Sequence, residues 1–194
     1  MKKNLSLIVA LAMAALSLAI ISCASTPMSK SEKEEKQGSV RDMANKAIAD
    51  LYAKNPAARS EISKAAGYAV FSDFGFKFIF MGGAGGSGVA VNNATKQETF
   101  MKMAEFQPGL GFGAAKFRIV FIFETLEAFN SFVTSGWEAG ANAMAIAKTK
   151  GEGGSLAGAV TVSKGVKMIQ LNDEGGIVGV SLTAAKYYKD KELN

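Results

Sequence analysis

The spacing of apolar residues changes along the chain, from a helical period near its start to an alternating one further on. From Ser39, apolar residues recur every three or four positions, which is the period of an amphipathic helix. A second helix is predicted after Asn55-Pro56, because a capping Asn followed by Pro is typical of a helix start, and Gly67 ends it. A third predicted helix covers Thr125–Ser135, with Gly136 as its stop signal.

Elsewhere apolar and polar residues mostly alternate, which predicts short strands joined by turns. Four phenylalanines at even positions from Phe74 to Phe80 share one side of such a strand, and we expect the helices to bury them. Together the elements predict a single α+β domain in which an antiparallel sheet packs against about three helices. The predicted strands are Tyr68–Ser72, Phe74–Met81, Val89–Val91, Gln97–Phe106, Gly111–Glu124, Ala139–Ala147, Ala157–Ser163, Lys167–Asn172 and Ile177–Ala185; the predicted turns are Asn92-Asn93, Gln107-Pro108-Gly109 and Asp173–Gly176.

A glycine-rich stretch after the second of these strands has the spacing G-x-G-x-x-G of a dinucleotide-binding turn. Such a turn requires a helix that starts at the last glycine and holds the pyrophosphate. Here Val89–Val91 and the Asn92-Asn93 turn follow instead, and no Lys-Ser/Thr pair completes a P-loop. We therefore expect no nucleotide or other cofactor, and glycines that serve the architecture by allowing a bend or a close backbone approach. These glycines are Gly83, Gly85, Gly86 and Gly88.

The composition argues against catalysis. The chain contains no His, which removes the usual general base and the commonest metal ligand, and its one Cys allows no internal disulfide. No carboxylates are predicted to pair across a pocket, so neither an enzyme nor a metal site is expected. The net charge of +5 falls to +3 without Lys2 and Lys3, and no basic stripe indicates nucleic-acid binding.

The first residues are typical of an export signal. Residues 1–22 have a basic start and a long apolar run, and Ile20-Ile21-Ser22-Cys23 resembles the bacterial lipoprotein box, in which the Cys is acylated and becomes the new N-terminus. Several acyl chains on Cys23 would anchor the protein stably to a membrane. Ala24 resembles the sorting pattern for the outer membrane, which places the protein at the periplasmic face of the cell envelope. Residues 23–38 are polar and are predicted to form a flexible tether.

Six segments of the remaining chain carry a family resemblance: Ala65–Phe71, Gly75-Phe76, Gly82–Val89, Gly109–Phe129, Val166–Leu171 and Thr183–Asp190. Through these segments, about residues 39–190 resemble the SYLF domain family. The resemblance implies a strongly curved, half-barrel-like antiparallel sheet on a few helices. It also implies lipid binding in a general sense, because eukaryotic members bind phosphoinositide membranes and some bind actin. Residues 173–179 depart from the eukaryotic Ser-Lys-Gly-Leu-Phe-Ala-Gly pattern, so those two ligands are not carried over.

Two functions are compatible with these observations. In the first, the domain of a membrane-anchored lipoprotein binds phospholipid without catalysis. In the second, a structural lipoprotein docks unidentified envelope proteins and touches lipid only through Cys23. For the first we predict a site on one side of a strand, where two basic residues precede two apolar ones: Lys116, Arg118, Val120 and Ile122.

Overall fold

Two very long strands organise the sheet of this protein. In the computed structural model, β1 (Gly67–Asn92) and β2 (Glu98–Phe123) have 26 residues each. They pair antiparallel along almost their whole length. The short strands predicted in this region are therefore parts of two continuous ones. The turn predicted at residues 107–109 is wrong: these residues lie inside β2, opposite an irregularity of register after Ile79.

The structure describes residues 28–139, 158–178 and 184–194, and only the backbone of residues 75–81, 107–115, 139, 177 and 178. Residues 31–194 form one compact unit, to which the following description applies. The predicted strands after Gly136 lie partly outside the described residues. The remaining elements are α2 (Lys30–Lys54), α3 (Ala57–Lys64), α4 (Leu126–Ser135), β3 (Trp137–Ala139), β4 (Val160–Ser163), β5 (Val166–Asn172), β6 (Ile177–Val178) and β7 (Ala184–Lys189).

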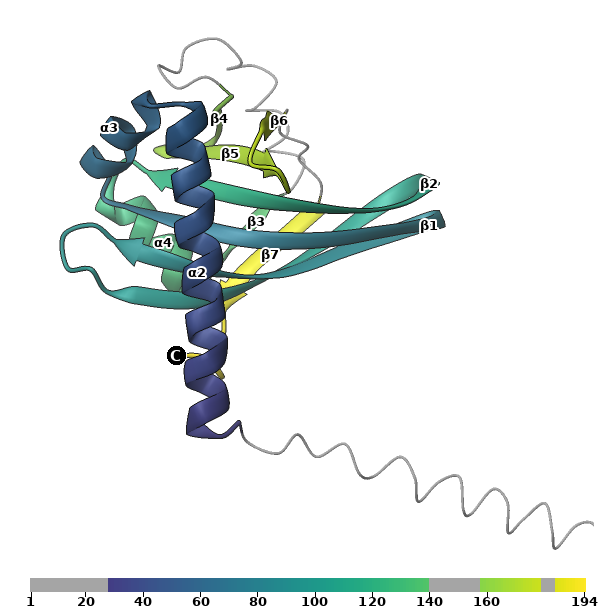
Figure 1. The fold of residues 1–194 in the computed structure, drawn as a ribbon, viewed down its shortest axis with the longest axis horizontal. Helices are drawn as coiled ribbons and strands as arrows, with labels where there is room; N and C mark the ends of the chain where they lie inside the picture. The colour runs from purple at the N-terminus through teal and green to yellow at the C-terminus, as the bar shows by residue number, and fades with distance from the viewer. Residues whose placement is uncertain (1–27, 140–157, 179–183) are drawn as a thin grey trace, which may run out of the picture. The chain divides into compact units, whose positions relative to one another are not determined.

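The described strands form one antiparallel sheet in the order β3-β7-β2-β5-β4, with β1 on β2 and β6 on β5. The first part of β2 pairs with β7 and its last part with β5. The sheet curls into a half-barrel that packs against helices, so the predicted α+β class is confirmed. Figure 1 shows α2 crossing one side of the strands, while α4 lies on the other side.

The predicted turn at Asn92-Asn93 is confirmed, and each Asn has its own role in it. The side-chain oxygen of Asn92 accepts hydrogen bonds from the backbone N–H groups of Ala94 and Thr95, at 2.9 and 3.0 Å. The side-chain amide of Asn93 donates to the carbonyl oxygens of Ile62 and Ala65 at the end of α3. Because these carbonyls have no partner inside the helix, Asn93 fixes the end of α3 on the hairpin.

Strand β1 doubles back and crosses itself. A side-chain carbon placed at Gly86 would overlap the carbonyl oxygen of Ser72, and one at Gly88 would overlap that of Val70. A straight strand would separate Ser72 from Gly86 by about 45 Å, so the chain must reverse its direction between them. Gly86 and Gly88 therefore have the architectural role predicted for them.

The other two glycines of the run have room for a side chain. The nearest backbone atom to a carbon placed at Gly83 is 3.5 Å away, and at Gly85 it is 3.8 Å away, both ordinary contacts. The architectural role predicted for Gly83 and Gly85 is not supported by such crowding.

Because β1 reverses direction, the paired strands β1 and β2 form two layers, here called the doubled sheet. Its inner face lies between the layers and its outer face points away from them, and each face contributes residues to a buried core. On the inner face Phe71, Phe121 and Tyr187 pack edge to face with ring centroids 4.9–6.0 Å apart. Phe129 and Phe132 of α4 also belong to this core, and both lie on the face of that helix that was predicted to be apolar. The outer face lies under α2 and α3, whose buried residues are Val40, Ala44, Ala47, Leu51, Ala58 and Ile62.

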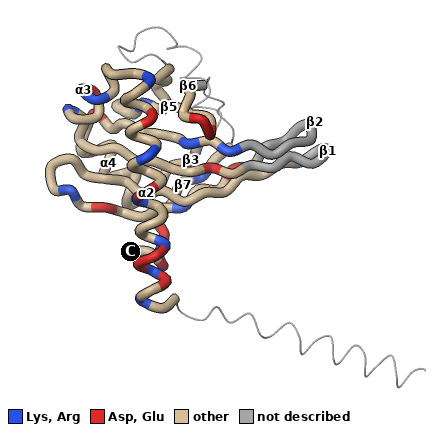
Figure 2. The backbone as a smooth tube through the Cα atoms, viewed as in Figure 1, with Lys and Arg blue, Asp and Glu red and all other residues tan. Residues whose placement is uncertain are grey.

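Helix α2 begins at Lys30, nine residues before the predicted start, so residues 30–38 are not the flexible tether expected there. This first part has no apolar period, and Figure 2 shows both signs of charge along it. Polar contacts to the far end of the chain hold it: Lys33 Nζ donates to the carbonyl oxygen of Asn194 at 2.9 Å, and Gln37 donates to that of Leu193 at 2.7 Å.

The close approach of β1 to itself predicts that substitution of Gly86 destabilises the protein, whereas substitution of the adjacent Gly85 hardly does. Gly86→Ala should lower the free energy of unfolding by about 1–3 kcal/mol, because the backbone of residue 72 must move to admit the methyl group. Gly85→Ala, with open space at its site, should change it by less than about 0.5 kcal/mol. Urea denaturation of both variants measures this difference. Equal losses for the two variants would contradict the crossing.

Candidate functional site

The four residues predicted to bind lipid share one side of β2, but three of them are buried. Arg118 is 4% exposed, Val120 is fully buried and Ile122 is 1% exposed. They lie on the outer face, which α2 and α3 cover, so the predicted exposed basic and apolar surface is wrong for these three. Lys116 alone of the four is exposed.

Arg118 has a structural role. Its Nη1 donates to Oδ2 of Asp50 on α2 at 2.7 Å, and its Nη2 donates to the carbonyl oxygens of Asn172 and Asp173. Asp50 also accepts a hydrogen bond from Lys46, 2.9 Å away. The hydrogen bonds from Lys46 and Arg118 lower the pKa of the Asp50 carboxyl. Arg118 thus connects α2 to the predicted turn after β5, which the structure confirms at residues 173–176.

A groove opens on the outer face where the cover of α2 ends. Phe74 lies opposite Lys116 in the β1–β2 register, and it is 56% exposed. The expected burial of this phenylalanine is therefore wrong, and the side chains of the other three lie outside the described residues. The Lys116 side chain is 53% exposed, with Asp173 Oδ1 3.9 Å from its Nζ. The groove measures about 370 Å³ and is lined by Ser39, Val40, Met43, Ser72, Phe74, Gly85, Gly86, Ser87 and Lys116.

The inner face contains a pair of carboxyl groups that sequence reasoning missed. Asp73 is 3% exposed and shares a side-chain hydrogen bond with Glu105. Its Oδ1 is buried and makes no hydrogen bond. Burial raises the pKa of Asp73 to about 7, and the nearby charge of Glu105 contributes to the rise. The sequence predicts no carboxylates paired across a pocket; this pair lies in the interior, and its two members together line none of the described pockets.

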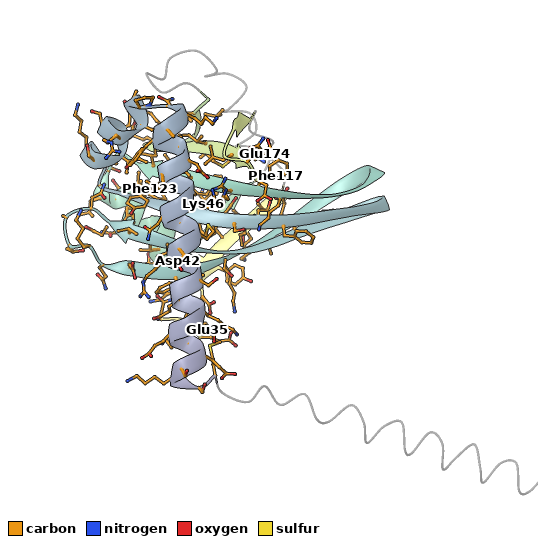
Figure 3. The ribbon with its side chains drawn as sticks, in the orientation of Figure 1. Glu35, Asp42, Lys46, Phe117, Phe123 and Glu174 are labelled. Atoms are coloured by element: carbon orange, nitrogen blue, oxygen red, sulfur yellow. The ribbon has the colours of Figure 1, made fainter. Side chains whose placement is uncertain are left out.

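The sequence does contain a signal for this pair: two acidic residues stand at positions where the alternating pattern predicts core residues. Asp73 follows Ala69 and Phe71 at odd positions of β1, and Glu105 follows Met101 and Met103 in β2. Because alternate residues of a strand share a face, both acids continue apolar rows that lead into the core. Figure 3 labels Phe123 and Phe117, two residues of the corresponding row in the last part of β2.

Several predicted features gain no support from the described residues. Cys23 and the signal segment lie outside them. Within the described ranges, no group of three or more acidic, His or Cys side chains is arranged to hold a metal ion. No helix there is both long enough and apolar enough to cross a membrane.

Comparison with known proteins identifies a relative from a bacterium. No protein-family model matches the chain. Beta cell expansion factor A from Aeromonas veronii is 31% identical over 160 residues, which cover 82% of this chain and 59% of that protein. The chain thus spans little more than half the length of this curated relative.

The ion pair of Asp50 and Arg118 predicts a pH-dependent contribution to stability. Asp50→Asn should lower the free energy of unfolding by about 1–2 kcal/mol at pH 7, because Arg118 loses its charged partner. Since the pKa of Asp50 is lowered on folding, this contribution is complete well above pH 3.8 and disappears as the pH falls through the folded value. Denaturation of both proteins between pH 7 and pH 3 measures the difference.

Asp42→Asn is the matched control, because Asp42 is an exposed carboxylate on the same helix (Figure 3). It should change stability little at any of these pH values. A difference between wild type and Asp50→Asn that stays constant down to pH 3 would show that the charge of Asp50 is not what stabilises Arg118.

Proposed function

We propose that this protein is a lipid-anchored, non-catalytic envelope protein whose folded domain binds anionic phospholipid at the groove beside Lys116. The single observation that carries this proposal is the juxtaposition of Phe74 and Lys116. They are cross-strand neighbours, both more than half exposed, at the edge of a groove that Val40 and Met43 line from α2.

The chemistry of this groove fits a phospholipid. A lysine ammonium attracts the phosphate of a head group, and each such residue near an anionic membrane contributes about 1 kcal/mol. An exposed phenylalanine ring leaves water when it inserts at the boundary between head groups and acyl chains. In the native state Lys116 has only a weak competitor, because Asp173 is 3.9 Å away and mostly exposed. The ammonium is therefore available to a phosphate group.

The N-terminal segment supports the same proposal independently. Acylation of Cys23 would hold the domain at a membrane surface, and Ala24 favours the periplasmic face of the outer membrane. The resemblance to the SYLF family points to lipid as the ligand class. Membership in that family is itself part of the proposal.

Vesicle binding tests the groove. A soluble form starting at Ser25, which contains the whole compact unit of residues 31–194, should bind phosphatidylglycerol-containing vesicles at low salt. Lys116→Ser should weaken this binding by about 1 kcal/mol, or fivefold, and should hardly affect vesicles of phosphatidylcholine alone. Phe74→Ser should weaken binding to the anionic vesicles by a similar factor, because an interfacial ring is lost. Co-sedimentation measures all of these affinities.

Two matched controls locate the effect. Lys164 is an exposed lysine in the turn between β4 and β5, and Phe106 is a phenylalanine with 51% exposure outside the groove. Their Ser variants should bind as wild type does. If all four variants bind alike, the groove is the wrong site. If the wild-type domain ignores anionic vesicles at low salt, lipid binding by the domain is refuted and docking of envelope proteins becomes the better hypothesis.

A further inference from the structure

The hydrogen bond between Asp73 and Glu105 joins two parts of the sheet that are not neighbours in it. Asp73 lies in the first part of β1, opposite Phe117 of β2. Glu105 lies in the first part of β2, where its partners are Ala84 of β1 and Ala185 of β7. The two carboxyl groups thus meet across the interior of the doubled sheet.

The surroundings of this pair are apolar or neutral. Tyr187 of β7 approaches it, and burial together with the charges of Glu105 and Asp73 raises the pKa of its phenol, so that it stays uncharged. The other described side chains of the inner core are apolar apart from Gln170 of β5, a neutral amide that lies opposite Ile119 and is 7% exposed. Lys116 and Arg118 lie at alternate positions of β2 and belong to the outer face, while Lys186 of β7 is paired with Glu138 at 2.7 Å.

We propose that Asp73 and Glu105 form a proton-operated clasp, which holds the two layers of the doubled sheet together while the pair shares a proton and lets them part when both carboxyls ionise. One proton lets one carboxyl donate a hydrogen bond to the other. Its removal places a second negative charge beside that of the half-buried Glu105, on the buried carboxyl of Asp73, whose Oδ1 has no hydrogen-bond partner. Parting of the layers admits water to Asp73. This inference does not rest on lipid binding.

The difference in the pKa of Asp73 between the closed and the open form determines how opening depends on pH. An aspartate carboxyl in water has a pKa near 3.8, and burial raises that of Asp73 to about 7. The closed form therefore holds the proton more tightly than the open form, and rising pH favours opening. The opening equilibrium should increase by up to tenfold per pH unit between about pH 4 and pH 7, and should level off above that range.

Two measurements on the full chain in detergent micelles test the clasp. Carbon-13 NMR of the carboxyl groups gives the titration midpoint of Asp73, and amide hydrogen exchange, corrected for its intrinsic pH dependence, gives the opening equilibrium. Wild type should titrate near pH 7, and the amides of residues 71–73 and 103–105 should open more as the pH rises to that value. Asp73→Asn, which keeps the shape and removes the charge, should open equally at all these pH values.

Two further variants complete the test. Glu105→Gln should lower the midpoint of Asp73, since one negative neighbour is lost, and Asp42→Asn, far from the interior on an exposed helix face, should behave as wild type does. A midpoint of Asp73 near pH 4 would overturn the clasp. So would an opening equilibrium with the same pH dependence in wild type and Asp73→Asn.

Discussion

The close approach of β1 to itself is the constraint on which the rest of the structure depends. At Gly86 and Gly88 the strand passes so near residues 70–72 that no side chain fits between the backbones. This contact lets one hairpin supply two layers, and the space between them becomes the aromatic core. Without it, β1 and β2 would form an open hairpin, and β7 and β5, which pair with opposite ends of β2, would not be brought around a common core. Helices α2 and α4 would then lack the two faces on which they pack.

The two faces of the doubled sheet compensate the charge of a buried ionisable group, Arg118 or Asp73, in different ways. Burial of a charge is costly unless a partner or a proton removes it. Arg118 on the outer face stays charged, because Asp50 and two carbonyl oxygens receive its hydrogen bonds. Asp73 on the inner face is opposed by another acid, and the cheaper solution there is to hold a proton. One face therefore has a pH-insensitive connection near neutrality, and the other has a pH-sensitive one.

Much of the fold could be predicted from local pattern, because the responsible interactions are local. The helix that ends at Ser135 and the turn at Asn92 depend on caps and on side chains within a few residues. The start of α2 could not be predicted in this way, since its first part is held by Gln37 and Lys33 through contacts with residues more than 150 positions away. The reversal of β1 is equally non-local. Its glycines are visible in the sequence, but the residues that they approach are not.

The candidate site was predicted only in part for the same reason. Alternation correctly put Lys116 and Arg118 on one side of β2, yet it could not reveal that Asp50 pairs with the buried Arg118, while Lys116 stays more than half exposed beside Asp173. Alternation also puts Phe74 on the outer face, but it could not reveal that this ring lines an open groove with Val40 and Met43 of α2 and stays 56% exposed. The acid pair was visible as two polar residues in apolar rows, and it was missed because each strand was considered alone.

The crossing of β1 is tested most directly by proton–proton contacts in solution. The structure predicts nuclear Overhauser effects between the α-protons of Gly86 and Gly88 and the backbone of residues 70–72, together with the ladder contacts of Gly86 to Met103 and of Ser72 to Arg118. Ladder contacts without any contact between the two parts of β1 would mean an open hairpin, and would contradict the doubled sheet and the clasp within it.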